Sequence, residues 1–234
     1  MLFVGRESEK KKIIKSLKDG KNIILGGKFG IGRTSLMKRI SEIFADKRKF
    51  IFIDFSKTPG KMSEKLIREL ELSARFKKTG EKMGYKAMRY CVAASASFAD
   101  KPIIVFDNIA KLTGQKIIFL RYLIQEDHFQ FIAIVENFLP PRDLAHLRAH
   151  LLPADVLSLR NLKMNDVLSF MRIYSQKHTL NLSDQHIHEL AGVVNGYPLN
   201  IIELIKNISK GAPGKKSYPA TNPQEGETKK LMES

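Results

Sequence analysis

Apolar residues along this chain occur in two alternating patterns. In residues 7–18 they stand three and four positions apart among charged residues, which predicts an amphipathic surface helix. The apolar run 22–26 ends in glycines and is typical of a buried strand, whereas 34–45 returns to helical spacing. The chain is therefore predicted to begin with the order helix, strand, loop, helix.

The same alternation continues to about residue 160. It predicts further strands at 50–55, 103–106, 129–135 and 155–159, and further helices at 63–77, with Ser63 as N-cap, and at 114–125. Near-continuous apolar strands that alternate with helices are typical of a parallel sheet covered on both faces. We therefore expect residues 1–160 to form a three-layer α/β/α domain with a five-stranded parallel sheet.

The pattern changes after residue 160. Three helical stretches, at 165–176, 183–194 and 199–208, follow one another without a strand between them, so we predict a small helical module over 161–208. From residue 209 onward Gly, Pro, Ser, Thr, Lys and Glu dominate. That composition predicts a disordered tail.

Composition narrows the class of protein. The apolar runs are far shorter than the ~20 residues that span a bilayer, and the first residues lack the basic stretch and apolar region of a secretory signal. The single cysteine, Cys91, excludes an intrachain disulfide and has no neighbours that would make it a nucleophile. We therefore expect a cytoplasmic protein with no membrane partner.

Positive charge is concentrated in the first part of the chain. The net charge is +16, and residues 1–90 hold 24 Lys and Arg against 10 Asp and Glu. A positive field of this kind favours binding to a polyanion such as a nucleic acid, because Lys and Arg side chains neutralise its phosphates and so release the counterions bound to them. A lysine-rich solvated surface explains the asymmetry equally well, so a nucleic acid partner stays an open alternative.

The loop between the first strand and the next helix has the chemistry of a phosphate site. Its sequence, GGKFGIGRTS, fits the pattern G-x-x-x-x-G-K-[ST], except that an arginine holds the lysine position. The glycines allow successive N–H groups to point at one anion, and the following helix adds its positive end. The residues expected to bind nucleotide here are Gly27, Lys28, Phe29, Gly30, Ile31, Gly32, Arg33, Thr34 and Ser35.

Two of the side chains are expected to hold Mg²⁺. Thr34 offers a hydroxyl at the start of the helix, and Asp107 places a carboxylate at the end of the strand that begins at residue 103. We therefore predict ATP and Mg²⁺ as the ligands of this site.

With these motifs, residues 2–208 resemble the AAA+/STAND division of P-loop ATPases, particularly compact prokaryotic and archaeal members and the transposition-regulator and origin-initiator types. The segment FVGRE at 3–7 looks like the family's opening segment, which implies that Val4, Gly5 and Arg6 lie against the adenine. The segment NGYPL at 195–199 is similar to the G-x-P element of the family's helical lid. This resemblance implies a nucleotide contact for Pro198.

The resemblance also implies catalytic positions, two of which depart from the family pattern. Arg33 keeps the charge of the family's lysine but is longer and planar, and Asn108, after Asp107, replaces a glutamate with an amide that cannot accept a proton. The resemblance implies a polar sensor at Asn137. Glu136 is either a substitute carboxylate or a solvated acid at the strand end. We therefore predict that ATP is bound but hydrolysed slowly.

Two functions fit these features. The first is a switch in which ATP holds the helical module against the sheet and so controls assembly or partner binding. The second is an ATP-regulated DNA-binding adaptor that uses the basic N-terminal half. The family resemblance also makes Arg142 and Arg148 candidates for contacting the nucleotide of a neighbouring subunit in a homo-oligomer, although the same arginines could simply flank a helix.

Overall fold

The computed structural model describes residues 3–209 except 73–100, 126, 179 and 181, so Cys91 and residues 210–234 of the predicted tail lie outside the described residues. Ser209, the first residue of the predicted tail, is instead the last residue of a helix. Its centre is a five-stranded sheet in the order β2-β3-β4-β1-β5, and every neighbouring pair is parallel. The strands are β1 (Asn22–Gly26), β2 (Phe50–Asp54), β3 (Ile103–Ile109), β4 (Gln130–Val135) and β5 (Ala154–Ser158). The predicted parallel sheet is therefore confirmed, with its fifth strand.

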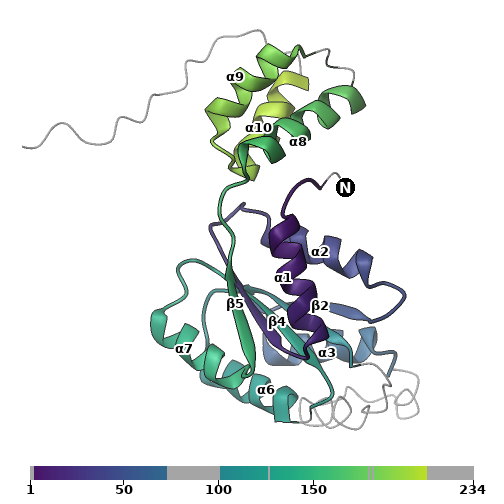
Figure 1. Cartoon of the computed structure of the whole chain (residues 1–234). Helices are drawn as coiled ribbons and strands as arrows, with labels where there is room; N and C mark the ends of the chain where they lie inside the picture. The colour runs from purple at the N-terminus through teal and green to yellow at the C-terminus, as the bar shows by residue number, and fades with distance from the viewer. Residues whose placement is uncertain (1–2, 73–100, 126, 179, 181, 210–234) are drawn as a thin grey trace, which may run out of the picture.

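Helices cover both faces of this sheet (Figure 1). Ile23 and Leu25 of β1 pack in the core shared with α1 and α2, whereas Ile24 packs in the core on the side of α3, α6 and α7. The bounds are α1 (Glu7–Lys18), α2 (Arg33–Ile43), α3 (Pro59–Glu69), α6 (Gly114–Gln125) and α7 (Pro141–His150). This alternation of buried side chains along β1 confirms the three-layer arrangement. Among the described helices, none is both long and apolar enough to cross a bilayer.

The predicted start of α3 was wrong. The N-cap is Thr58, whose hydroxyl accepts a hydrogen bond from a backbone N–H of the first turn, and Pro59 follows it. Ser63 instead lies buried inside the helix and donates its hydroxyl to the Pro59 carbonyl. A threonine before a proline starts a helix efficiently, because the proline has no N–H to satisfy there.

The carboxyl edge of the sheet contains an irregularity at the predicted acid. β3 continues past Asp107 to Ile109, its register against β4 shifts between Phe106 and Ile109, and Asn108 has a φ of 62°. Asp107 therefore lies at a distortion within the strand and not at its end. Because β1 is next to β4 in the sheet, this edge faces the loop that follows β1.

The last three helices form the predicted module. α8 (Met164–Lys177), α9 (Asp184–Val194) and α10 (Pro198–Ser209) pack around an apolar core of their own, and they lie beyond the carboxyl edge of the sheet (Figure 1). The Leu162 N–H donates to the Gly196 carbonyl at 2.7 Å, which joins the entry of the module to the turn before α10. Gly196 has a φ of 68°, and a Cβ there would lie 2.2 Å from the Leu162 oxygen, so only glycine fits.

Candidate functional site

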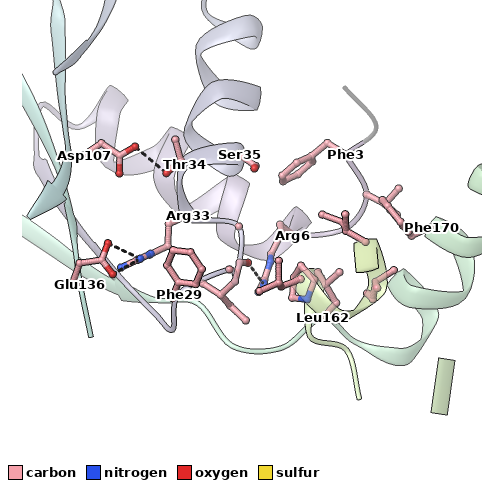
Figure 2. Close-up of a pocket in the computed structure, with 18 of the residues that line it drawn as sticks. Phe3, Arg6, Phe29, Arg33, Thr34, Ser35, Asp107, Glu136, Leu162 and Phe170 are labelled. Atoms are coloured by element: carbon pink, nitrogen blue, oxygen red, sulfur yellow. Dashed lines mark hydrogen bonds and ion pairs between the residues drawn. The ribbon is translucent and has the colours of Figure 1, made fainter. Parts of the chain in front are cut away.

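A cavity of about 320 Å³ lies between the loop after β1 and the helical module, with the segment before α1 and the ends of β3 and β4 completing its walls (Figure 2). Most of the predicted site residues line it. These are Val4, Arg6, Phe29, Gly30, Ile31, Gly32, Arg33, Thr34, Ser35, Asp107, Asn108, Glu136 and Pro198. The other predicted residues, Gly5, Gly27, Lys28 and Asn137, are not part of the lining.

The loop after β1 has a backbone that only glycine adopts readily. Gly27, Gly30 and Gly32 have φ values of 145°, 75° and 93°. In the part of the chain that the structure describes, the backbone N–H groups of Gly30 and Gly32 have no hydrogen-bond acceptor. These amides, together with the N-terminus of α2, can therefore bind an anion.

The carbonyls of this loop are held from outside. The Tyr197 hydroxyl, just before α10, donates to the Phe29 carbonyl, and Arg6 Nη2 donates to the Ile31 carbonyl at 3.1 Å. Arg6 is buried and is also paired with Glu9 at 3.0 Å. Since both carbonyls are bound by flanking elements, the loop is fixed while its amides stay open to a ligand.

The two predicted magnesium ligands lie together. Thr34 Oγ1 donates to Asp107 Oδ2 at 2.9 Å, and the second carboxylate oxygen accepts from the Asn108 N–H at 2.9 Å. Hydroxyl and carboxylate oxygens are the donors that Mg²⁺ prefers, so these side chains fit the ion. Within the described residues no group of three or more His, Cys, Asp or Glu could hold a metal by itself. The remaining ligands would be waters and phosphate oxygens.

Arg33 does not extend into the loop but turns to the end of β4. Its Nη2 binds both carboxylate oxygens of Glu136, at 2.8 and 2.7 Å, and its Nη1 donates to the Val135 carbonyl. The Arg33 and Glu136 side chains are only 7% and 11% exposed. The length of arginine allows this reach, and the planar fork suits a carboxylate.

Asp54, at the end of β2, does not line the cavity but contacts Asn108, which does, and the sequence did not reveal this contact. Asn108 Nδ2 donates to Asp54 Oδ1 at 3.2 Å, and Asp54 is the register partner of Asp107. Burial acts to raise the pKa of Asp54, but hydrogen bonds from Ser56 and Asn108 and the charge of Lys57 hold it below its ordinary value. The pairing of β2 with β3 places Asp54 beside Asp107 and Asn108, and strand order is not written in local sequence.

The far end of the cavity is apolar. Phe3 comes from the segment before α1, Leu162 and Phe170 come from the start of the module and from α8, and Ile201 comes from α10. Figure 2 shows this end opposite Asp107 and Glu136. Apart from Phe3, which belongs to the predicted FVGRE segment, these residues have no motif and were not predicted. Their apolar surfaces suit a flat ring system, whereas the strand ends suit charged groups.

Neither a comparison with protein-family models nor one with curated proteins finds a match to this sequence. Solved structures do match. The Orc1 protein of Aeropyrum pernix, in complex with DNA, superposes with a TM-score of 0.63 at 12% identity, over 89% of this chain and 60% of that one. The Walker-type ATPase of Pyrococcus abyssi gives 0.62 at 14%, over 90% and 69%. A signal transduction ATPase with numerous domains and a tetratricopeptide repeat sensor from Pyrococcus horikoshii gives 0.56 at 16%, over 92% and 31%.

This chain therefore spans less than two thirds of the Orc1 chain and about a third of the Pyrococcus horikoshii protein. At identities this low, the likeness shows the fold and not a shared activity. The parallel sheet, the glycine-rich loop after β1 and the helical module together make up this fold. The chain has the fold of the AAA+/STAND-type P-loop ATPases.

Proposed function

We propose that this chain binds Mg-ATP in the cavity and acts as a nucleotide-dependent switch with slow hydrolysis. The observation that carries the proposal is that the phosphate loop and the helical module wall the same cavity. Contacts of Tyr197 with Phe29 and of Leu199 with Gly30 also join these two walls directly. A ligand that contacts both walls favours the docked arrangement by its differential affinity for it.

Each wall has a distinct binding role. The loop amides and the N-terminus of α2 would hold the phosphates, and Thr34 with Asp107 would hold Mg²⁺, whose charge offsets that of the phosphates. Phe3 and Phe170 offer aromatic surface to the base. The cavity thus offers polar groups for the phosphate end of a nucleotide and aromatic surface for its base.

Slow hydrolysis follows from the groups at the strand ends. The Asn108 amide cannot accept a proton, and Asp107 is a proposed ligand of Mg²⁺. Both oxygens of Glu136, the other carboxylate among the described residues that line the cavity, are bound by Arg33. A general base typically contributes about 10²–10⁴-fold to a rate. Since no uncommitted carboxylate lines the cavity in the described part of the chain, the site is better suited to holding ATP than to cleaving it.

Isothermal titration calorimetry with Mg-ATP tests the binding site. We expect Thr34→Ala to weaken Mg-dependent binding about tenfold, because it removes one proposed ligand of the ion. Ser41→Ala, which removes a hydroxyl from the same helix away from the cavity, is the matched control and should bind as the wild type does. An absence of Mg-ATP binding to the wild type would refute the proposal, as would unchanged binding by Thr34→Ala.

The output of the switch is tested by measuring mass in solution with and without Mg-ATP. Arg142 and Arg148 are exposed on α7, so each can contact a second copy. Assembly only with nucleotide, abolished in the double Arg142→Ala/Arg148→Ala variant, would support control of assembly. A constant mass would leave partner binding as the output.

A second candidate function is nucleotide-regulated binding to DNA. The supporting observation is a row of exposed lysines on α1, which packs against α2 on one face of the sheet. The lysines are Lys11, Lys12, Lys15 and Lys18. The Aeropyrum pernix Orc1 structure is a complex with DNA, which makes duplex DNA the first probe to use.

Fluorescence anisotropy with a duplex across a salt series tests this second function. The double variant Lys12→Gln/Lys15→Gln should lower affinity for every sequence and reduce the salt slope by about one for each phosphate that a lysine no longer neutralises. The control is Lys163→Gln/Lys177→Gln, which removes the same charge from the helical module. An affinity that does not respond to salt would exclude binding through DNA phosphates.

A further inference from the structure

The cations of the candidate site are already paired. Of the described residues that line the cavity, Arg6 and Arg33 carry positive charge. Arg6 is bound to Glu9, and Arg33 is bound through one nitrogen to both oxygens of Glu136. A third phosphate that enters this cavity therefore finds no uncommitted cation among these side chains.

Glu136 lies at the end of the cavity where the last phosphate would be. The apolar walls around Phe170 suit the base, and the loop amides suit the phosphates next to it. The chain of phosphates then leads toward the strand ends, where Asp107 and Glu136 lie (Figure 2). A phosphate added beyond the second one approaches the pair of Arg33 and Glu136.

We infer that Glu136 is a specificity-determining residue that competes with the third phosphate for Arg33 and so reduces the preference of the site for ATP over ADP. The inference rests on the proposed function, since it concerns the same nucleotide. If Arg33 turns to the phosphate, Glu136 is left with its carboxylate only 11% exposed and without its cation, which is unfavourable. If Arg33 stays, the phosphate lies beside a carboxylate and a neutralised cation. Either arrangement carries a cost that ADP, which lacks the third phosphate, does not meet.

Glu136 and the third phosphate would compete for the same guanidinium group, that of Arg33. The contact from Arg33 to Glu136 is buried and joins one nitrogen to both carboxylate oxygens, and the Val135 carbonyl accepts from the other terminal nitrogen. Three of the five N–H donors of the guanidinium are taken by these contacts, and its charge is balanced by the Glu136 carboxylate, so a phosphate must compete with Glu136 for that charge. A neutral amide at position 136 would free the cation while keeping a side chain of the same size.

The test compares affinities and does not depend on turnover. Calorimetry gives the Kd of Mg-ADP and of Mg with a non-hydrolysable ATP analogue for the wild type, for Glu136→Gln and for Glu42→Gln. Glu42→Gln is the matched control, because it removes the carboxylate partner of Arg39 on the exposed side of α2. We expect the wild type to bind ADP at least as tightly as the analogue. We expect Glu136→Gln to shift the ratio about tenfold toward the analogue, and Glu42→Gln to leave it unchanged.

The outcomes separate this inference from the proposed function. A wild type that binds the analogue more than about tenfold tighter than ADP overturns the inference, and this result needs no variant. If both nucleotides bind but Glu136→Gln leaves their ratio unchanged, the inference fails while nucleotide binding stands. If neither binds the wild type, both proposals fail.

Discussion

The Tyr197 hydroxyl donates a hydrogen bond to the backbone carbonyl of Phe29, so a side chain of the helical module holds a peptide of the phosphate loop. Next to this contact, Leu199 packs against the backbone of Gly30. The two parts that a nucleotide would bridge are therefore already joined by one polar and one apolar contact. A change in the conformation of the loop therefore perturbs its contacts with the module, and the reverse also holds.

Removing this hydroxyl should weaken nucleotide binding. Tyr197→Phe keeps the ring in its apolar surroundings but leaves the Phe29 carbonyl without its donor, so the loop is held less firmly. A net hydrogen bond contributes about 0.5–1.5 kcal/mol, which predicts a roughly 2–10-fold higher Kd for Mg-ATP in calorimetry. Tyr174→Phe removes a hydroxyl elsewhere in the module and should have no effect. Equal affinities for wild type and Tyr197→Phe would show that the contact does not support the binding conformation.

A methyl group at Gly30 should separate the loop from the module. The φ of Gly30 is 75°, and a Cβ there would lie 2.9 Å from Leu199 Cβ. The left-handed backbone alone costs a non-glycine residue about 1–2 kcal/mol, and the clash adds to it. We expect Gly30→Ala to lower the affinity for Mg-ATP at least tenfold in calorimetry.

Gly192→Ala provides the matched control for that substitution. Gly192 lies inside α9, and a Cβ there meets no atom within 4 Å. Alanine should therefore stabilise the helix by about 0.5–1 kcal/mol in urea denaturation and leave nucleotide binding unchanged. If both alanine variants bind nucleotide equally, the close approach at Gly30 does not matter for binding.

The parts of the site that sequence predicted are those that depend on local pattern. The loop from Gly27 to Ser35 follows a strand and starts a helix, so the motif alone was enough to place its glycines and Thr34 in the site. Asp107 was assigned to the same site because it follows the apolar strand that begins at residue 103. The structure places Thr34 Oγ1 2.9 Å from Asp107 Oδ2, close enough for both side chains to reach one ion.

Other parts depend on which strands are neighbours, and local pattern does not contain that information. Asp54 contacts Asn108 because β2 pairs with β3, and Arg33 meets Glu136 because β1 lies beside β4.

The start of α3 is a different case. Its signal, Thr58 followed by Pro59, is present in the sequence, but the serine one turn later also fits a cap and stands closer to the apolar residues of the helix.

Thr58→Ala tests the corrected start of that helix. It removes the cap that accepts a backbone N–H of the first turn, so it should lower the free energy of unfolding by about 0.5–1 kcal/mol in urea denaturation. Ser63→Ala should cost less, because the Pro59 carbonyl that Ser63 contacts already lies within the helix ladder. A larger loss of stability for Ser63→Ala than for Thr58→Ala would favour Ser63 as the cap.

The carboxylate of Asp54 should make stability depend on pH. Its pKa in the folded chain lies below the ordinary value, because hydrogen bonds from Ser56 and Asn108 and the charge of Lys57 outweigh the opposing effect of burial. The unfolded chain therefore binds the proton more readily, and the stabilisation is complete above about pH 4 and is lost as pH falls through the folded pKa. Asp54→Asn should thus unfold at lower urea than the wild type at neutral pH, with a difference that shrinks below pH 4. Added salt should reduce the difference at neutral pH as well, since the side chain of Asp54 is 37% exposed and its attraction to Lys57 is screened. A difference that stays constant from neutral pH to about pH 2 would mean that Asp54 contributes through packing and not through its charge.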